Sequence, residues 1–313
     1  MQKSKVVQQI SIALQANVPI MLWGEPGIGK SSIVRYIADK LRWPCYTIIA
    51  SIHDPTDFSG LPYIDKDRNM TCHALPYYLI ELNNYENAIL FLDEVNCAPL
   101  SVQAALFRLV LEKAIDNYKL HDGVRIIAAS NPTEFNEASY EFSTPLINRF
   151  VHLQFKIEDD LWLDGLRLGQ FHDYYIPILP ADWKNKLPEA SAIVASFLDK
   201  HRALIQNIPN ERSKREYGFP TMRSWHMFVI PLLAACRSID VDESITLDLI
   251  AGAIGTNAAI EFMTYLKNLD IPSIDYILQN YNNIDWNKIR RDVAYVICTN
   301  LVMYVKDLSL IHI

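Results

Sequence analysis

The sequence predicts an α/β protein in which a parallel β-sheet is covered by helices on both faces and is followed by a small all-helical domain. Two observations lead to this prediction. Short apolar runs alternate with helical stretches through the first half of the chain, which is typical of strand–helix–strand units in a parallel sheet. After Pro188, apolar residues recur at helical spacing only, which indicates a second domain built from helices.

The first half of the chain is expected to hold the sheet. The apolar runs expected to form its strands are Ile20–Trp23, Cys45–Ala50, Ile89–Leu92, Arg125–Ser130 and Phe150–Gln154. We therefore assign residues 1–157 to an α/β core. Residues 54–78 interrupt this core with turn-forming residues such as Gly60 and Pro62, so they are expected to form a loop–hairpin–loop insertion.

The second half is expected to begin with an irregular connector at 158–188, which is rich in aromatic residues and contains Pro177 and Pro180. The helical domain then spans 189–313. Its helices are expected at Ala190–Leu204, Met222–Cys236, Ile245–Ala259 and Trp286–Tyr304.

One pattern in the first half points directly to chemistry. Residues 24–31 read Gly24-Glu25-Pro26-Gly27-Ile28-Gly29-Lys30-Ser31, the G-x-x-x-x-G-K-[ST] pattern of a phosphate-binding loop. Its glycines allow backbone N–H groups to turn toward an anion at the positive end of the following helix. Lys30 is expected to reach the β- and γ-phosphates of a nucleotide, and the Ser31 hydroxyl to bind Mg²⁺. Ser32 belongs to the same expected nucleotide-binding set.

Two further strand ends carry polar side chains that a phosphate site needs. Asp93 and Glu94 follow the run Ala88–Leu92, and the carboxyl ends of parallel strands face the place where phosphates bind. Asp93 is expected to hold Mg²⁺, and Glu94 to polarise the attacking water. Asn131 follows the run ending at Ser130 and is expected to contact the γ-phosphate or the water. Such residues often simply open loops, but the three motifs in this order indicate a P-loop NTPase core.

Composition limits the classes of partner. The chain has 313 residues, half of them apolar, and its 29 basic and 36 acidic residues give a net charge of −7. This balance weakens a nucleic-acid-binding interpretation without excluding it, because one local surface can be basic while the rest of the protein is acidic. The basic clusters at 212–215 and 288–291 are expected to be solvated faces.

The remaining composition predicts a cytoplasmic protein with no membrane insertion, because no apolar run is long enough to span a bilayer. The five cysteines are odd in number and scattered, which favours reduced thiols over a disulfide framework. Neither the cysteines nor the histidines follow a metal-ligand spacing, so no transition metal is expected.

Together these motifs resemble those of a MoxR-like AAA+ ATPase, a member of the helix-2-insert clade, over nearly the whole chain. The run Phe91–Asn96 is similar to the group's Walker B motif. Other matching segments are the start of the helix-2 insertion (54–62), the hairpin before the sensor-1 strand (114–123), the arginine-finger segment (146–150), the sensor-2 segment of the lid (219–225) and later lid helices (258–262 and 269–272). The resemblance implies that the nucleotide is ATP, which the loop by itself does not distinguish from GTP.

The resemblance also implies roles for two arginines. Arg149 would be a finger that completes the site of a neighbouring subunit, which implies a ring, in this family typically a hexamer. Arg223 would report the nucleotide state to the lid, which is the family's term for the helical domain at 189–313. From the residues alone, Arg149 could instead pair with a carboxylate at a sheet edge, whereas a cation such as Arg223 in the first turn of a helix suggests a bound phosphate. Arg108, on an otherwise apolar helix, is the alternative finger.

What the resemblance implies about function is an ATPase that remodels or matures a partner protein in a chaperone-like way, typically a partner with a von Willebrand factor A domain. Two alternatives stay open. One is a nucleic-acid motor, because helicase-type relatives carry the same insertion. The other is a nucleotide-switched scaffold, although the complete set of Lys30, Asp93 and Glu94 argues against it. The sequence identifies neither the client nor the pathway, and Ile313 need not be the natural C-terminus.

Overall fold

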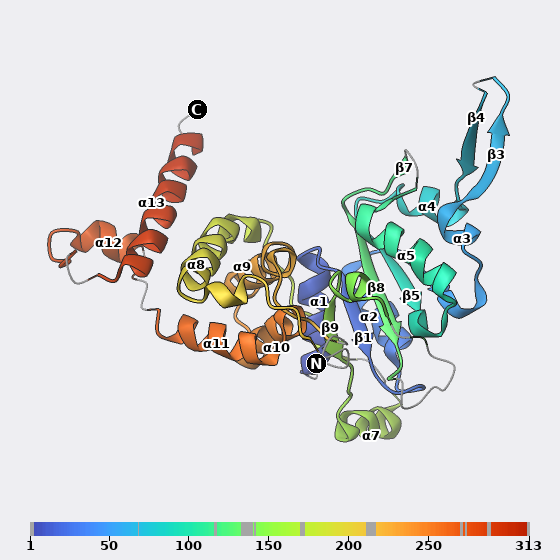
Figure 1. Cartoon of the computed structure of the whole chain (residues 1–313). Coiled ribbons are helices and arrows are strands. Elements are labelled where there is room, and N and C mark those ends of the chain that lie inside the picture. Colours follow the sequence, from blue (N-terminus) through green and yellow to red (C-terminus); the bar gives the residue numbers. More distant parts are fainter. Residues whose placement is uncertain are drawn as a thin grey trace. The chain divides into compact units, whose positions relative to one another are not determined.

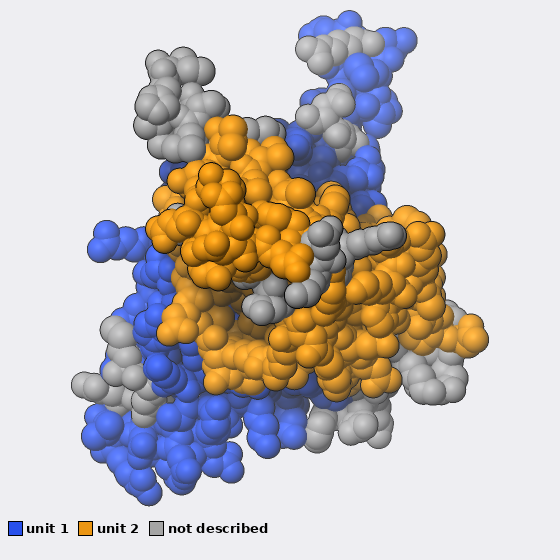
Figure 2. Space-filling view, turned by 90° about the vertical axis from the view of Figure 1, so that its left-hand side faces the viewer, with its two compact units in different colours: residues 1–178 blue, residues 179–313 orange. Residues whose placement is uncertain are grey.

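The computed structural model describes residues 3–67, 69–115, 118–132, 140, 142–169, 173–210, 217–269, 272, 274–286 and 289–311. The chain divides into two compact units, Met1–Ile178 and Leu179–Ile313, which Figure 2 colours separately. The whole basic cluster at 212–215 and Lys288 of the second cluster lie outside the described residues. No helix within the described ranges is both long and apolar enough to span a lipid bilayer.

The first unit is built on a five-stranded sheet. Its strands are β1 (Ile20–Trp23), β2 (Cys45–Ile49), β5 (Ala88–Asp93), β8 (Val124–Ser130) and β9 (Val151–Gln154). They lie in the order β2-β5-β8-β1-β9, and every neighbouring pair is parallel (Figure 1). The predicted fold, a parallel sheet with helices around it and a helical region after it, is therefore confirmed. The strand order reverses at β1, which has β8 on one side and β9 on the other.

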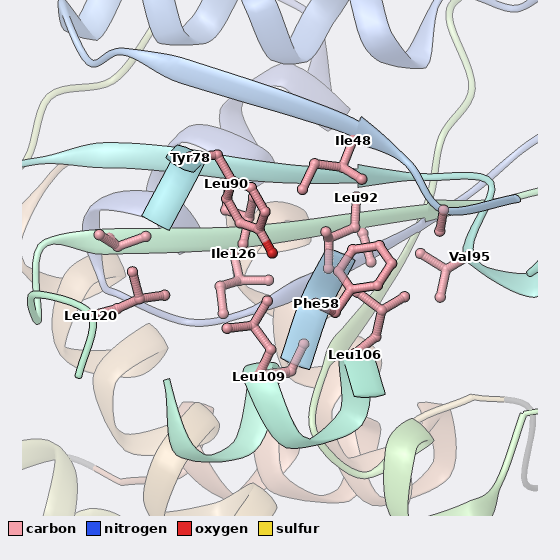
Figure 3. Close-up of a cluster of buried hydrophobic side chains, with 14 of the residues drawn as sticks. Ile48, Phe58, Tyr78, Leu90, Leu92, Val95, Leu106, Leu109, Leu120 and Ile126 are labelled. Carbon is pink, nitrogen blue, oxygen red and sulfur yellow. The ribbon is translucent and has the colours of Figure 1, made fainter. Parts of the chain in front are cut away.

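Both faces are covered along the interior strands, which explains why β1, β5 and most of β8 read as continuous apolar runs. Residues Leu90 and Leu92 point to the face that packs on α5 (Leu100–Glu112), where Leu106 and Leu109 meet them (Figure 3). The alternate residues belong to the other face, where α1 (Lys5–Gln15) and α2 (Lys30–Leu41) contact the strands. The interior strand β5 is buried along Ala88–Leu92, so that only its carboxyl end approaches solvent.

The segment expected to be an insertion forms α3 (Thr56–Ser59), the hairpin of β3 (Leu61–Asp65) and β4 (Met70–Ala74), and α4 (Tyr77–Leu82). Phe58 and Tyr78 are buried at its base, and Figure 3 shows Phe58 between the strands and α5. The hairpin itself projects away from the sheet (Figure 1). A shorter hairpin, β6 (Ala114–Ile115) with β7 (Tyr118–Lys119), precedes β8.

Three expectations about helices need correction. The segment expected to be an irregular connector contains the helix α7 (Asp159–Leu168), whose first turn carries Asp159 and Asp160, which complement the helix dipole. The single helix expected at Ile245–Ala259 is two, α10 (Glu243–Ile254) and α11 (Thr256–Lys267), because Gly255 with φ of 82° breaks it. The helix expected from Trp286 begins only at Arg291, as α13 (Arg291–Ile311).

Within its described residues, the second unit is built from helices and loops without strands. Its other helices are α8 (Leu187–Lys200), a π-helical turn at Ser224–Val229, α9 (Ile230–Ser238) and α12 (Ile274–Asn280). An aromatic cluster forms its centre: the ring of Phe197 lies 5.7 Å from that of Trp225 and 5.1 Å from that of Phe262. The Trp225 indole N–H donates to the carbonyl of Leu204, so its polar atom is satisfied within the apolar cluster.

A buried polar contact joins β1 to β9 beside the main-chain ladder. The Trp23 indole Nε1 donates to His152 Nδ1 at 2.9 Å, and the two rings stack with centroids 6.1 Å apart. Since His152 Nδ1 accepts this bond, the imidazole proton sits on Nε2, which donates to the Ile147 carbonyl at 3.0 Å. Burial lowers the pKa of His152 to about 4, although the bond to Ile147 opposes the shift. His152 is therefore neutral at physiological pH.

This histidine should make the first unit sensitive to acid. Its folded pKa of about 4 lies below its ordinary value of 6.5, so the unfolded chain binds more protons between these limits and the native state loses stability as pH falls through them. The variant His152→Gln can keep both hydrogen bonds without titrating. The unfolding free energy of wild type relative to His152→Gln should fall by about 2 kcal/mol between about pH 7 and pH 5, measured by urea unfolding. A difference that does not depend on pH would contradict the prediction.

Candidate active site

The glycine-rich loop runs from the carboxyl end of β1 to the first turn of α2. Gly27 and Gly29 have φ of 81° and 96°, a backbone conformation that side-chain-bearing residues rarely adopt. Gly24 N donates to the Ser130 carbonyl, which ties the start of the loop to the end of β8. Glu25 and Pro26 are exposed at the tip, and Ile28 is partly buried. The sequence thus places the amino end of a helix at the point where the strand order reverses, where open α/β sheets bind ligands.

Lys30 is the buried cation of this loop. Its Nζ lies 2.8 Å from the Gly24 carbonyl, 3.0 Å from the Glu25 carbonyl and 2.7 Å from Asn131 Oδ1. Burial lowers the pKa of Lys30, while the charges of Asp93 and Glu94 oppose that shift. Lys30 is 7% exposed and is surrounded by oxygen acceptors. Its ammonium group is therefore already largely desolvated, so it can bind a phosphate without losing much bound water.

Ser31 and Asp93 meet across the gap between α2 and β5. Ser31 Oγ donates to Asp93 Oδ2 at 2.6 Å, so a hydroxyl and a carboxylate converge beside the loop. This is the donor set that Mg²⁺ takes together with nucleotide phosphates. The described part of the chain has no group of three or more His, Cys, Asp or Glu able to hold a metal. The Ser31 hydroxyl and the Asp93 carboxylate fit a Mg²⁺ that arrives with a nucleotide, because both are oxygen ligands beside the phosphate loop. Ser32 lies exposed in the same turn of α2.

Glu94 adopts an unusual backbone and has a partner that sequence reasoning missed. Its φ of 54° places it in the left-handed region, and such strain in a side-chain-bearing residue concentrates at functional sites. The Ser51 hydroxyl donates to Glu94 Oε2 at 2.7 Å and so orients the carboxylate. Ser51 is the second residue after β2, in the short 3₁₀ turn Ala50–Ile52. A polar residue closing an apolar strand run at the carboxyl edge is the signal that could have revealed it.

Asn131 is held by a second residue that was not among the expected site residues. Asn96 is 1% exposed, and its side-chain amide donates to the Asn131 carbonyl at 2.7 Å. The Asn131 backbone N–H donates back to Asn96 Oδ1 at 3.4 Å. This reciprocal pair fixes the end of β8 against the turn after β5, so that the Asn131 side chain stays at Lys30. Asn96 belongs to the run Phe91–Asn96, but its spacing gave no sign of this contact.

Arg149 lies away from these residues. It precedes β9, which pairs with β1 so that Val151 stands opposite Ile20 and Gln154 opposite Trp23. The phosphate loop follows Trp23, so Arg149 and the loop lie at opposite ends of this strand pair, roughly 16 Å apart for five residues of strand. Arg149 Nη1 donates to the Pro145 carbonyl at 2.6 Å. The geometry argues against a role for Arg149 at the phosphates of its own subunit.

The other candidate arginines have different settings. Arg108 is 56% exposed on α5 and pairs with Glu112 one turn later, as an ordinary helix surface residue does. Arg223 belongs to the second unit, where it is exposed directly before the π-helical turn. Thr221 and Ser224 exchange hydrogen bonds around it, since each backbone N–H donates to the other's hydroxyl at 2.8 and 3.0 Å. These reciprocal bonds fix the helix start that presents Arg223.

The sheet order, the loop and the polar groups gathered at the carboxyl edge together define a P-loop nucleotide-binding unit of the AAA type. Residues 19–150 match the family model of the AAA domain of the dynein-related subfamily. This part of the chain is thus similar to dynein-related AAA domains, and the resemblance to a MoxR-like AAA+ ATPase is confirmed at that level.

Individual relatives agree with this assignment. Midasin of Dictyostelium discoideum is 32% identical over 125 residues, which cover 37% of this chain and 2% of that protein. Protein MoxR of Methylorubrum extorquens is 23% identical over 154 residues, covering 48% of this chain and 43% of that protein. The chain spans less than half the length of each of these relatives. The likeness to them concerns the AAA domain.

A solved structure extends the likeness of the fold. The crystal structure of a presumed ATPase from Cytophaga hutchinsonii superposes with a TM-score of 0.51 at 16% identity, covering 86% of this chain and 90% of that protein. At this identity the match concerns the fold alone. It reaches beyond residues 19–150 and so includes helical parts of the second unit.

Proposed function

We propose that this chain hydrolyses ATP in a ring of identical subunits and uses the cycle to remodel a partner protein. The observation that carries the hydrolytic part is the convergence of Lys30, Ser31 and Asp93 at the glycine-rich loop, with Asn131 bound to Lys30. Glu94 follows Asp93 directly and is oriented by Ser51. A nucleotide switch without hydrolysis would have little need for an oriented, strained Glu94.

Each residue has a separate task in this proposal. The backbone of residues 24–29 would cradle the phosphates, and Lys30 would bind the β- and γ-phosphates. Ser31 and Asp93 would hold Mg²⁺, which supplies charge neutralisation on the phosphates when bound. Glu94 would orient a water and take its proton, while Asn131 would hold that water or the γ-phosphate in line.

Arg149 would act in the neighbouring subunit. Its place at the amino end of β9, remote from its own phosphate loop, supports a role in trans over one in its own site. AAA+ proteins generally assemble as rings, and a hexamer is the expected form here. Arg108, held by Glu112 on its own helix, is the second choice for the finger. Arg223 would bind the nucleotide from the lid and report its state.

The projecting hairpin supports a protein client. Its exposed side chains are largely apolar: Leu61 is 63% exposed, Ile64 71% and Met70 48%. Exposed apolar side chains gathered on one element usually mark a protein contact. From the end of β3 the sequence reads Asp65-Lys66-Asp67-Arg68, two acidic and two basic residues, which does not make the basic surface that nucleic acids require. A partner with a von Willebrand factor A domain is the proposed client class.

A trap experiment tests the proposal. The Glu94→Gln variant in ATP should retain its client, which is then identified by mass spectrometry after purification from cells that naturally contain this chain. Lys30→Ala, which cannot bind ATP, is the matched control. Retention of a protein by the trap but not by this control supports remodelling, and a von Willebrand factor A domain in it supports the client class.

A hairpin variant sharpens the test. Leu61→Ser together with Ile64→Ser alters two exposed side chains without disturbing the core, so it should release the client while ATP hydrolysis persists. Retention of nucleic acid that weakens steeply between about 50 and 200 mM salt would instead favour the motor. That result would overturn the remodelling proposal without touching the ATPase assignment.

A further inference from the structure

The buried contact between Trp23 and His152 connects two functional elements. Trp23 directly precedes Gly24, the first residue of the phosphate loop, and its indole is 2.9 Å from His152 Nδ1. On its other side, His152 donates to the carbonyl of Ile147, the last residue of the short helix α6 (Thr144–Ile147). Trp23 is 7% and His152 5% exposed, so water does not compete for these bonds.

The carbonyl that His152 reaches also closes the turn that carries Arg149. Phe150 N donates to the same Ile147 carbonyl at 3.2 Å, and Arg149 N donates to the Leu146 carbonyl at 3.1 Å. Arg149 Nη1 in turn donates to the Pro145 carbonyl within this segment. The ladder between β1 and β9 covers only Val151–Gln154, so it does not reach the turn. The side chain of His152 thus adds a connection that the backbone lacks.

We propose that Trp23 and His152 are positioning residues for Arg149. They fix the turn at 147–150, which carries Arg149, relative to the phosphate loop of the same subunit. The inference rests on the proposed role of Arg149 in trans. The rings of Trp23 and His152 are stacked and buried, so close packing leaves each side chain few alternative rotamers. A subunit would therefore offer its finger to the neighbour in a geometry that its own phosphate loop helps to fix. This couples adjacent sites through one subunit.

Mixed rings separate this role from an ordinary structural one. A Lys30→Ala subunit supplies only a finger, and an Arg149→Ala subunit supplies only a nucleotide pocket. The test adds His152→Leu, which removes both hydrogen bonds, to one partner at a time and measures ATP hydrolysis by the mixture. In the finger-supplying subunit it should lower the rate about 10-fold or more, because a misplacement of about 1 Å can cost about 100-fold. In the pocket-supplying subunit the rate should change less than about twofold, since no finger is used there.

Three further variants make the result specific. His152→Gln can accept from Trp23 and donate to Ile147, so it should retain the activity that His152→Leu loses. Trp23→Phe keeps the ring and removes the N–H, so it should reproduce the asymmetry from the other end of the link. Trp43→Phe, the same exchange at a tryptophan that contacts Arg125 elsewhere in the unit, should leave both mixtures unchanged. Ring assembly and ATP binding by each pocket subunit are measured alongside.

Equal losses in both arrangements, or none in either, would overturn the inference, because a general destabilisation acts on both subunits alike. One other result would contradict the proposed function itself, namely the role of Arg149 in trans. If the parent mixture of Lys30→Ala and Arg149→Ala is inactive although mixed rings form, Arg149 does not act in trans, and the inference falls with it.

Discussion

Replacing Glu94 by Gln is expected to leave ATP binding intact and to lower turnover by about 10²- to 10⁴-fold, because a positioned general base contributes about that much. The amide keeps the size of the carboxylate and can still accept from the Ser51 hydroxyl, so the fold at the end of β5 should persist. Lys30→Ala should behave differently and abolish binding, since it removes the one buried cation at the phosphate loop among the described residues. Nucleotide binding by calorimetry and phosphate release by a coupled assay measure the two effects separately.

A control variant tests whether Glu94 acts chemically. Glu94→Asp keeps the charge but shortens the side chain by one methylene, so the carboxylate no longer reaches the Ser51 hydroxyl. Its rate should lie between those of wild type and Glu94→Gln. Equal hydrolysis by wild type and Glu94→Gln would show that another group activates the water.

Removal of Arg149 should have the second large effect. A trans finger contributes about 10³- to 10⁵-fold to turnover, so Arg149→Ala should be nearly inactive while still binding ATP. Mixing it with Lys30→Ala should restore part of the activity, because one subunit then provides the intact pocket and the other the intact finger. Hydrolysis by each variant alone and by the mixture is the measurement. Arg108→Ala, which breaks only the surface pair with Glu112, is the matched control and should retain activity.

A mixture that stays inactive in rings shown to contain both variants would contradict the role of Arg149. If Arg108→Ala then proved inactive on its own, the finger would be reassigned to α5. Wild-type activity that does not fall on dilution below the concentration of ring assembly would contradict any trans finger, whichever arginine is considered.

The sequence by itself determined the sheet, because its interior strands β1, β5 and β8 are largely apolar runs that have to be buried on both faces. It also placed the phosphate loop, since the glycines of the loop and Lys30 lie at fixed spacing within one short segment of the sequence. The pairing of Asp93 with this loop followed from a general rule, that carboxyl ends of parallel strands share one edge. Ser31 and Asp93 lie 2.6 Å apart as that rule predicts, although 62 residues separate them in sequence.

Helix boundaries in the second unit were less predictable. Apolar spacing continues across Gly255, but the positive φ of that glycine ends α10 and starts α11. The spacing of apolar residues does not reveal such a local change in chain direction, so the sequence predicted one helix where the structure has two. In α7, Trp162 is 53% and Leu166 51% exposed. The apolar residues of α7 do recur at helical spacing, but the helix has only 10 residues and contains Gly165, which lowers helix propensity, so its signal was weak.

Only the tertiary structure decided which polar residues support the site. Ser51 reaches Glu94 and Asn96 reaches Asn131 because β2, β5 and β8 are neighbours in the sheet, an order that no local pattern encodes. The same holds for Trp23 and His152, which are 129 residues apart and meet because β9 adds to the far side of β1. Motifs can be read from sequence because their atoms lie close along the chain. Contacts between strands depend on the order of the sheet, which packing of the whole domain selects.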